Sequence, residues 1–270
     1  MSNSDIRTFQ TLHGSMMALA GDRYISRSLE LYGEFSGAEW DLLAQLAKPG
    51  MTVVEMGANI GTHSVAMAAQ CFPGPLYLFE PQQRIFQLLC ANLALNGVRN
   101  AIAYPEACGE APGVVIIPHL DYGAEFNFGG VSVMAEDAGV TGQKVRCTPL
   151  DSLDLPACHL IKLDVEGYEA QALRGAAETI RKHRPLLYVE NDRPQHQQEL
   201  ISLIAGMGYR QYWHLPPLFR PNNFNGNPQN VFENIVSVNM LCIPQEAGTV
   251  IQGMPLIDPD NWTSPVGRPG

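Results

Sequence analysis

The stretch VEMGANIGTHSVAMA, residues 54–68, decides how this chain folds. It begins in a β-branched run, passes through Gly57 and Gly61, and ends in small residues that favour a helix. That order predicts a strand, a tight loop and a helix. Glycine in such a loop lets the backbone approach a nucleotide closely. We therefore expect the loop to belong to a nucleotide site in an α/β fold.

The spacing of the glycines narrows the choice of nucleotide. The loop is G-x-x-x-G, whereas the dinucleotide fingerprint is G-x-G-x-x-G, and the G-K-S/T of a P-loop does not follow. Glu55 ends the predicted strand, where a carboxylate would repel a pyrophosphate and attract a cation. S-adenosylmethionine has an amino-acid tail, a sulfonium charge and no phosphate. We expect this cofactor rather than NAD or ATP.

Composition limits the class of protein. The chain has 270 residues, of which 46% are apolar, enough for the core of one large α/β domain or two small ones. The formal net charge of −10 disfavours nonspecific nucleic-acid binding, which depends on Lys and Arg against phosphate. We therefore expect no nucleic-acid partner.

Targeting and metal-binding patterns are missing from the sequence. The N-terminus lacks a basic-then-apolar signal pattern, and no apolar run is long enough to span a membrane. The six cysteines form no C-x-x-C pair, so a zinc site or redox pair is not expected. Dispersed cysteines fit small buried side chains in a reducing cytoplasm.

The rhythm of the sequence divides the chain into three parts. Residues 1–50 are predicted to form a mainly helical segment. Residues 51–246 alternate strands and helices, which predicts a mostly parallel sheet with helices on both faces. Within them, residues 109–155 break the rhythm and are interpreted as an inserted hairpin or small sheet. Residues 247–270 are expected to be a loose tail.

Three acids follow the predicted strands. Glu80 ends the second strand 19 residues after Gly61 (80 − 61), the position from which an acid binds ribose hydroxyls in doubly wound nucleotide sites. Asp164 and Glu166 follow a later apolar strand and so lie near the ligand crevice. Glu166 could instead simply favour the start of the next helix.

Three blocks of sequence carry a family resemblance. VVEMGANIGTHSVAMA, LYLFEP and IKLDVEGYEAQALRGA resemble the signature blocks of the FkbM family of S-adenosylmethionine-dependent methyltransferases, over about residues 50–243. The resemblance implies the class I methyltransferase fold, a Rossmann-like, seven-stranded, mostly parallel sheet whose last strand is antiparallel. It also implies methyl transfer to a hydroxyl oxygen, for instance of a polyketide or a sugar.

The resemblance also implies which residues bind the cofactor. The glycine loop would hold the methionine end, Glu80 the ribose, and the residues after the third strand would lie beside the adenine. Asp164 would face the methionine amine or the reacting centre. The implied cofactor-binding residues are Glu55, Gly57, Ala58, Asn59, Gly61, Thr62, Glu80, Pro81, Ala107, Cys108 and Asp164.

Methyl transfer to an alcohol benefits from a general base or a metal that removes the proton. Our candidate bases are Asp164, Glu166 and His214, with His119 as a further candidate. His214 ends a late strand and precedes two prolines, which should point it toward the crevice, although a single histidine is more often structural.

A metal is the alternative to a base. Asp164 with Glu190 and Asn191 resembles the arrangement in metal-dependent catechol methyltransferases and would suit Mg²⁺. The FkbM resemblance does not imply a metal, and we expect none. Activity that survives excess EDTA would exclude the metal.

Two loops are expected to shape the acceptor pocket, residues 121–131 and residues 218–234. They are rich in Asn, Gly and aromatic residues, which suits a sugar or another polar ring but is also usual in turns. Arg220 could meet an acidic group on the acceptor.

The acceptor is expected to be a hydroxyl of a small molecule or glycan. One alternative function is an NAD-dependent oxidoreductase, although the third loop glycine and a catalytic Tyr-Lys or His pair are missing. The other is a non-catalytic partner-binding protein on the same fold. The N-terminal segment could cover a partner in a homo-oligomer or cap the pocket.

Overall fold

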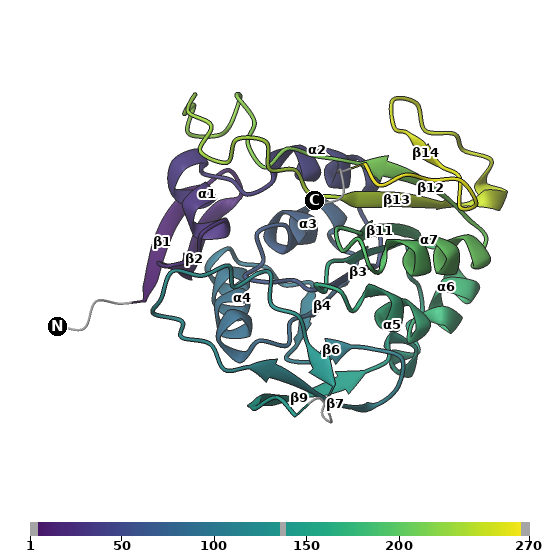
Figure 1. Ribbon diagram of the computed structural model, residues 1–270. Helices are drawn as coiled ribbons and strands as arrows, with labels where there is room; N and C mark the ends of the chain where they lie inside the picture. The colour runs from purple at the N-terminus through teal and green to yellow at the C-terminus, as the bar shows by residue number, and fades with distance from the viewer. Residues whose placement is uncertain (1–4, 136–138, 266–270) are drawn as a thin grey trace.

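The computed structural model describes residues 5–135 and 139–265 (Figure 1). The main sheet of the described chain has eight strands in the order β14-β12-β13-β11-β10-β3-β4-β5. Strands β11, β10, β3, β4 and β5 are parallel, and β13 is antiparallel to both β11 and β12. Their bounds are β3 (Val53–Met56), β4 (Leu76–Phe79), β5 (Ala101–Tyr104), β10 (Leu160–Leu163), β11 (Leu186–Glu190), β12 (Tyr209–His214), β13 (Asn239–Pro244) and β14 (Leu256–Ile257). This is the predicted class I methyltransferase sheet, extended by β14.

Helices cover both faces of the sheet (Figure 1). One face carries α3 (Ser64–Cys71) and α4 (Gln83–Leu95), and the other carries α5 (Glu169–Arg174), α6 (Ala177–His183) and α7 (Gln197–Gly206). Alternate strand residues enter the two cores, so that Val53 packs on one side and Val54 on the other. Helices α5 and α6 are separated at Gly175. A Cβ at that position would lie 1.9 Å from the carbonyl oxygen of Gly109.

The same alternation buries a polar row on the face that carries α3. Lys162 is paired in register with Glu55 on one side and Tyr188 on the other. All three are at most 4% exposed. A buried charge is stable only with a partner, so this row fixes where charged groups meet under the carboxyl ends of the strands.

The prediction that residues 1–50 are mainly helical is wrong for their first part. The chain forms a hairpin of β1 (Ile6–Thr11) and β2 (Gly14–Leu19), followed by α1 (Ile25–Tyr32) and α2 (Gly37–Leu46). Phe9 and Met16 are directly opposite each other and both buried. The Met, Ala and Leu of β2 are helix-forming residues, so composition concealed an alternating burial pattern.

The insertion is a small sheet, as one of the predicted alternatives had it. Its order is β6-β9-β7-β8, with β6 (Ala107–Cys108), β7 (Gly113–Pro118), β8 (Met134–Ala135) and β9 (Gly142–Thr148). Strands β7 and β9 pair over their whole length and pack against Tyr168 at the start of α5. The insertion therefore lies beside the carboxyl end of β10.

The tail is not loose throughout. Strand β14 pairs with β12, which buries Ile257, and the Trp262 indole donates a hydrogen bond of 2.7 Å to Gln198 on α7. A strand of two residues has no detectable period in the sequence, which is why the tail prediction failed. The last five residues of the chain lie outside the described part.

The cysteines are unpaired, and the helices are short. All six cysteines are free, and only Cys90 is exposed. No helix in the described residues is long and apolar enough to cross a bilayer.

Candidate active site

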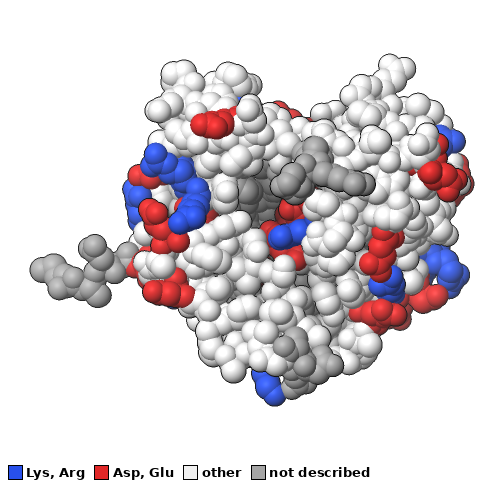
Figure 2. Space-filling view, viewed as in Figure 1, with Lys and Arg blue, Asp and Glu red and all other residues white. Residues whose placement is uncertain are grey.

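A cavity of about 410 Å³ opens at the carboxyl ends of β3, β4, β10 and β11. Figure 2 shows it as a hollow in the middle of one face, with acidic and basic side chains gathered at its edge. Its size is typical of a small-molecule site. Ligands of open α/β sheets bind at this edge because the loops there leave a crevice.

Most predicted site residues meet in this cavity. Those that line it are Glu55, Gly57, Ala58, Asn59, Thr62, Glu80, Pro81, Ala107, Cys108, Asp164 and Glu166. Gly61 and His214 do not line it. Gly61 has a φ of +86°, and a Cβ there would lie 2.8 Å from Leu89 on α4. Gly61 therefore shapes the loop and packs against α4 instead of contacting a ligand.

Gly57 brings the glycine loop against the end of β10. Its φ is +84°, and a Cβ would lie 1.7 Å from the carbonyl oxygen of Asp164. Glycine is therefore required here by both conformation and space. The contact places the loop and Asp164 in the same wall.

Glu80 is held at the end of β4 by two backbone amides. Its carboxylate accepts hydrogen bonds from the amides of Asn59, at 3.0 Å, and Gln82, at 2.8 Å. Burial raises the pKa of Glu80 to about 7, although the two amides oppose the rise. Each carboxylate oxygen retains a lone pair for a hydroxyl donor.

The positive charge that Glu55 was expected to attract is supplied by a side chain of the protein, Lys162. Lys162 Nζ lies 3.5 Å from Glu55 and 3.4 Å from Asp164, and the Ser64 hydroxyl donates to Glu55 at 2.5 Å. Burial alone would lower the pKa of Lys162, but Asp164, Glu55 and Glu39 raise it above its ordinary value. Lys162 was not predicted as a site residue, although a lysine within the apolar strand LIKL was a signal.

Three carboxylates converge beside this ion pair. Asp164, Glu166 and Glu190 can place one oxygen each within 4.8 Å of one another, and Arg193 forms an ion pair with Glu166. Burial and then Asp164 raise the pKa of Glu166 to about 8, and the same two causes raise that of Glu190 well above its usual range. Such a set could hold a cation.

The metal set suggested by the sequence is not assembled. The Asn191 amide donates to the Met240 sulfur at 3.4 Å, and Asn191 does not line the cavity. Glu166 takes the place that we expected Asn191 to occupy beside Asp164 and Glu190.

His214, a predicted candidate base, does not line the cavity. Its Nδ1 lies 2.8 Å from the Tyr188 hydroxyl, which also accepts a hydrogen bond from Asn239. Burial lowers the pKa of His214. Its Nδ1 is therefore engaged in a hydrogen-bond network with Tyr188 and Asn239. His119 is exposed at the end of β7 and also lies outside the cavity lining.

His63 and Glu39 line the cavity and were not predicted. His63 comes directly before α3, and its Nδ1 lies 3.8 Å from a Glu39 oxygen on α2. His63 Nε2 has no hydrogen-bond partner in the described residues. The histidine that directly follows the glycine loop was a usable signal, whereas Glu39 comes from a distant segment.

Arg220 faces away from the cavity, contrary to expectation. Its Nη2 donates to Glu34 at 2.8 Å and its Nη1 to Asp41 at 2.8 Å, while Nε also donates to Glu34. It therefore fastens the loop of residues 218–234 to the chain around α1 and α2. Of that loop, only Leu218 lines the cavity.

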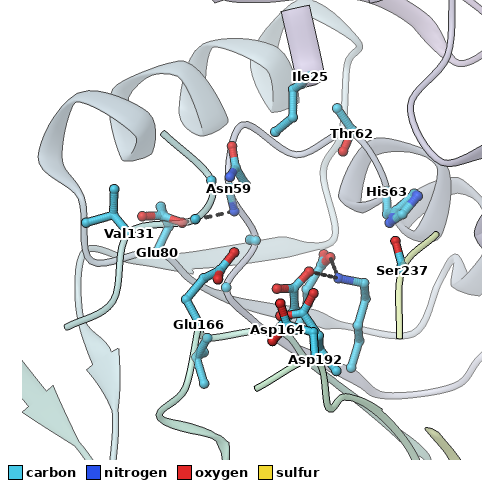
Figure 3. Close-up of a pocket in the computed structure, with 18 of the residues that line it drawn as sticks. Ile25, Asn59, Thr62, His63, Glu80, Val131, Asp164, Glu166, Asp192 and Ser237 are labelled. Atoms are coloured by element: carbon cyan, nitrogen blue, oxygen red, sulfur yellow. Dashed lines mark hydrogen bonds and ion pairs between the residues drawn. The ribbon is translucent and has the colours of Figure 1, made fainter. Parts of the chain in front are cut away.

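The other predicted loop does reach the cavity. Asn127, Gly129, Gly130 and Val131 line it, and the Gln82 side chain donates to the Phe128 carbonyl at 2.8 Å. In Figure 3, Val131 and Glu80 lie at one end of the pocket, and His63 and Ser237 at the other. The N-terminal segment contributes Tyr24, Ile25 and Phe35 to the lining, and the late part of the chain contributes Leu218 and residues 235–239.

The comparison with protein families gives a match to the methyltransferase FkbM domain over residues 55–211, more than half of the chain. The chain belongs to this family. The resemblance found in the sequence is thereby confirmed, and the oxidoreductase alternative is set aside. The FkbM match spans the glycine loop, Glu80 and the acids after β10. The N-terminal wall of the pocket and residues 235–239 lie outside it.

Comparisons with individual proteins add only the fold. No curated protein sequence matches the chain. A precorrin-6y C5,15-methyltransferase from Geobacter metallireducens aligns with a TM-score of 0.48 and 8% identity, covering 77% of this chain and 87% of that one. A methyltransferase FkbM from Methylobacillus flagellatus aligns with a TM-score of 0.45 and 17% identity, covering 76% and 50%. TYW2 of M. jannaschii, solved with AdoMet, aligns with a TM-score of 0.46 and 12% identity, covering 90% of this chain and 87% of that one.

Proposed function

We propose that this FkbM methyltransferase transfers the methyl group of S-adenosylmethionine to a hydroxyl of an uncharged small molecule or glycan. The observation that carries the proposal is the charge of the pocket. Two of the described lining residues are cations, Lys162 and Arg193, and both are already paired with acids. Eight of the described lining residues are acids, namely Glu39, Glu55, Glu80, Glu106, Asp164, Glu166, Glu190 and Asp192. Such a pocket favours a cationic cofactor without phosphate.

The cofactor would lie at the end of the pocket that holds Glu80. We assign the ribose hydroxyls to Glu80, with Pro81 beside them, and the adenine to the apolar wall of Ala107 and Cys108. Asp164 would face the ammonium group, and Glu166 would lie beside it. Bound S-adenosylmethionine supplies a methyl group on a sulfonium, which an aligned oxygen can displace.

The acceptor would occupy the opposite end, beside His63 and Ser237. That wall is mostly apolar, with a few hydroxyl and amide groups from Tyr24, Ser237 and Asn239. Among the described lining residues no unpaired cation is available for a phosphate. We therefore propose a neutral hydroxyl acceptor and no nucleic-acid substrate.

A metal-dependent transfer is the second candidate, favoured by the cluster of Asp164, Glu166 and Glu190. We propose the metal-free version, because Lys162 and Arg193 already neutralise two of these acids and the cofactor brings further positive charge. Transfer rates should be the same in excess EDTA and in added Mg²⁺. A rate that EDTA abolishes and Mg²⁺ restores would establish the metal-dependent alternative.

The proposal is tested by calorimetric titration with S-adenosylhomocysteine and with NAD, both in EDTA. We expect the first to bind and the second not to bind. Transfer of labelled methyl groups to a panel of neutral methyl glycosides and polyketide alcohols then identifies the acceptor class. If neither cofactor binds with or without Mg²⁺, the non-catalytic, partner-binding interpretation replaces this one.

A further inference from the structure

His63 has a nitrogen whose bonding is incomplete. The side chain is 5% exposed and lines the pocket, yet Nε2 has no partner among the described residues. Leaving a buried polar atom unpaired costs free energy, so a native protein usually keeps one only for a purpose. A hydroxyl bound in the pocket would complete the bonding of Nε2.

Neighbouring elements hold the imidazole in place. The rings of Phe35 and Trp40 pack beside it, with centroids 6.2 Å and 6.4 Å away. Glu39, whose Oε1 lies 3.8 Å from Nδ1, is fixed in turn by the Ser36 hydroxyl, which donates to Oε2 at 3.0 Å. A carboxylate facing Nδ1 favours the tautomer with the proton on Nδ1, which leaves the Nε2 lone pair free.

We propose that His63 Nε2 is the general base that takes the proton of the acceptor hydroxyl, with Glu39 as its positioning residue. The proposal rests on the function proposed above. His63 lies at the end of the pocket that we assign to the acceptor, away from Glu80 (Figure 3). It replaces His214, whose Nδ1 is taken by Tyr188.

The reaction couples displacement at the methyl carbon to one proton transfer. An oxygen lone pair of the hydroxyl forms the bond to the methyl carbon, and the carbon–sulfur bond breaks with its electron pair left on sulfur. The hydroxyl proton passes to the Nε2 lone pair. The products are a methyl ether, S-adenosylhomocysteine and an imidazolium facing Glu39, and the imidazolium then releases its proton to water.

Burial keeps His63 neutral before the reaction. Burial and then Lys162 lower the pKa of His63 to about 4, although Glu55 and Asp164 oppose them. His13 and Glu39 also face it, from β1–β2 and α2. The free base is therefore fully available at neutral pH.

The tautomer can be observed without knowing the acceptor. Nitrogen-15 NMR of the histidine-labelled protein bound to S-adenosylhomocysteine should show His63 with Nδ1 protonated and Nε2 unprotonated. The His63→Gln variant assigns the signals by their loss. A spectrum with the proton on Nε2 at neutral pH would overturn the proposal, even if every acceptor in the panel failed.

The role is tested with any acceptor in the methyl glycoside panel that the wild-type protein methylates. His63→Gln should lower kcat by about 10²- to 10⁴-fold, the usual worth of a general base. The affinity for S-adenosylhomocysteine should stay within a few-fold. The matched control is His119→Gln, the same change at an exposed histidine outside the cavity, which should leave kcat unchanged.

The pH profile separates a base from a structural side chain. Wild-type kcat should fall in acid as His63 is protonated, and this fall should be missing in His63→Gln. Glu39→Gln, which keeps the contact with Ser36 but not the charge, should lower kcat and move the fall to lower pH. A His63→Gln loss that appears wholly as weaker cofactor binding would assign His63 to the cofactor instead. Failure of the wild-type protein to bind cofactor would refute the proposed function, not this step.

Discussion

Gly50 and Gly57 have the same positive φ, +84°, but different surroundings. A Cβ at Gly57 meets the carbonyl oxygen of Asp164, whereas a Cβ at Gly50 meets nothing within 4 Å. Comparing the two separates the cost of the conformation from the cost of the close approach.

We predict that Gly50→Ala lowers the free energy of unfolding by about 1 kcal/mol, because alanine is strained at positive φ. Gly57→Ala should lose about 1–3 kcal/mol more, since the loop and β10 must move apart. Denaturant unfolding measures both. Gly57→Ala should also lose S-adenosylhomocysteine binding, and equal stability of the two variants would show that the close approach is unimportant.

Glu80 should make cofactor binding depend on pH. Its pKa in the free protein is raised to about 7 by burial. Ribose hydroxyls that donate to the carboxylate stabilise the charged form, so binding should release a proton below pH 7. The affinity for S-adenosylhomocysteine should then weaken by up to about tenfold per unit as the pH falls below 7.

The measurement is calorimetry in buffers of different ionisation enthalpy, for the wild type and Glu80→Gln. Glu166 and Glu190 also have raised pKa values, so only the difference between the two proteins reports on Glu80. An identical pH dependence in the variant would show that the ribose does not bind at this carboxylate.

Among the secondary-structure elements, the loop of residues 218–234 is joined to the chain around α1 and α2 by the ion pairs of Arg220 with Glu34 and Asp41, which we call the Arg220 cluster. Glu34 is 6% exposed, so removing Arg220 leaves a carboxylate buried with only a backbone amide, that of Phe224, as a donor. Arg220→Met should therefore lower the free energy of unfolding by about 3–5 kcal/mol. It should also raise the acceptor KM while leaving the affinity for S-adenosylhomocysteine unchanged.

The control for Arg220 is Arg27→Met on α1, where an exposed arginine lies 3.6 Å from Glu30. Exposed pairs contribute at most about 1 kcal/mol, so this variant should be nearly as stable as the wild type. Adding Glu34→Gln to Arg220→Met should recover part of the loss. Similar stability of the two arginine variants would mean that the cluster does not fasten the loop.

Strand β14 offers a second test at this scale, because its two residues differ in burial. Ile257 is 4% exposed and Leu256 is 63% exposed. Ile257→Ala should lower the free energy of unfolding by about 2–5 kcal/mol. Leu256→Ala should change it by no more than about 0.5 kcal/mol. Thermal unfolding measures the stability of both variants. If Ile257→Ala is as stable as the wild type, the packing of β14 does not stabilise the fold and the prediction of a loose tail is supported.

For the whole molecule, the acidity of the pocket predicts selection by charge. A neutral methyl glycoside that is methylated should lose at least about tenfold in kcat/KM, or 1.4 kcal/mol, when it carries a phosphate. Part of that loss should disappear at high salt, because ions screen the repulsion. Initial rates for the matched pair of acceptors test this, and a preference for the phosphorylated one would contradict the charge argument.

The sequence predicted the sheet better than it predicted the charges inside it. Alternating strands, the G-x-x-x-G loop and Glu80 are local patterns, and the structure brings them together as expected. A lysine within the apolar strand LIKL was a signal for Lys162, but the role of Glu39 depends on partners on other elements, which spacing along the chain could not reveal. The β1–β2 hairpin was missed because its residues favour helices. The hydrogen bond of His214 was not foreseen because its partner, Tyr188, is 26 residues away.

The family match ends at residue 211, before the late loop, and begins at residue 55, after the N-terminal helices. Both outlying segments contribute residues to the pocket lining, and Arg220 and Glu34 join them. We therefore predict that donor binding depends on the family domain, whereas acceptor choice depends on these two segments, which must be exchanged together. A chimaera that takes both segments from a relative should methylate that relative's acceptor. A chimaera that takes only one of the segments should lose the ion pair between Arg220 and Glu34.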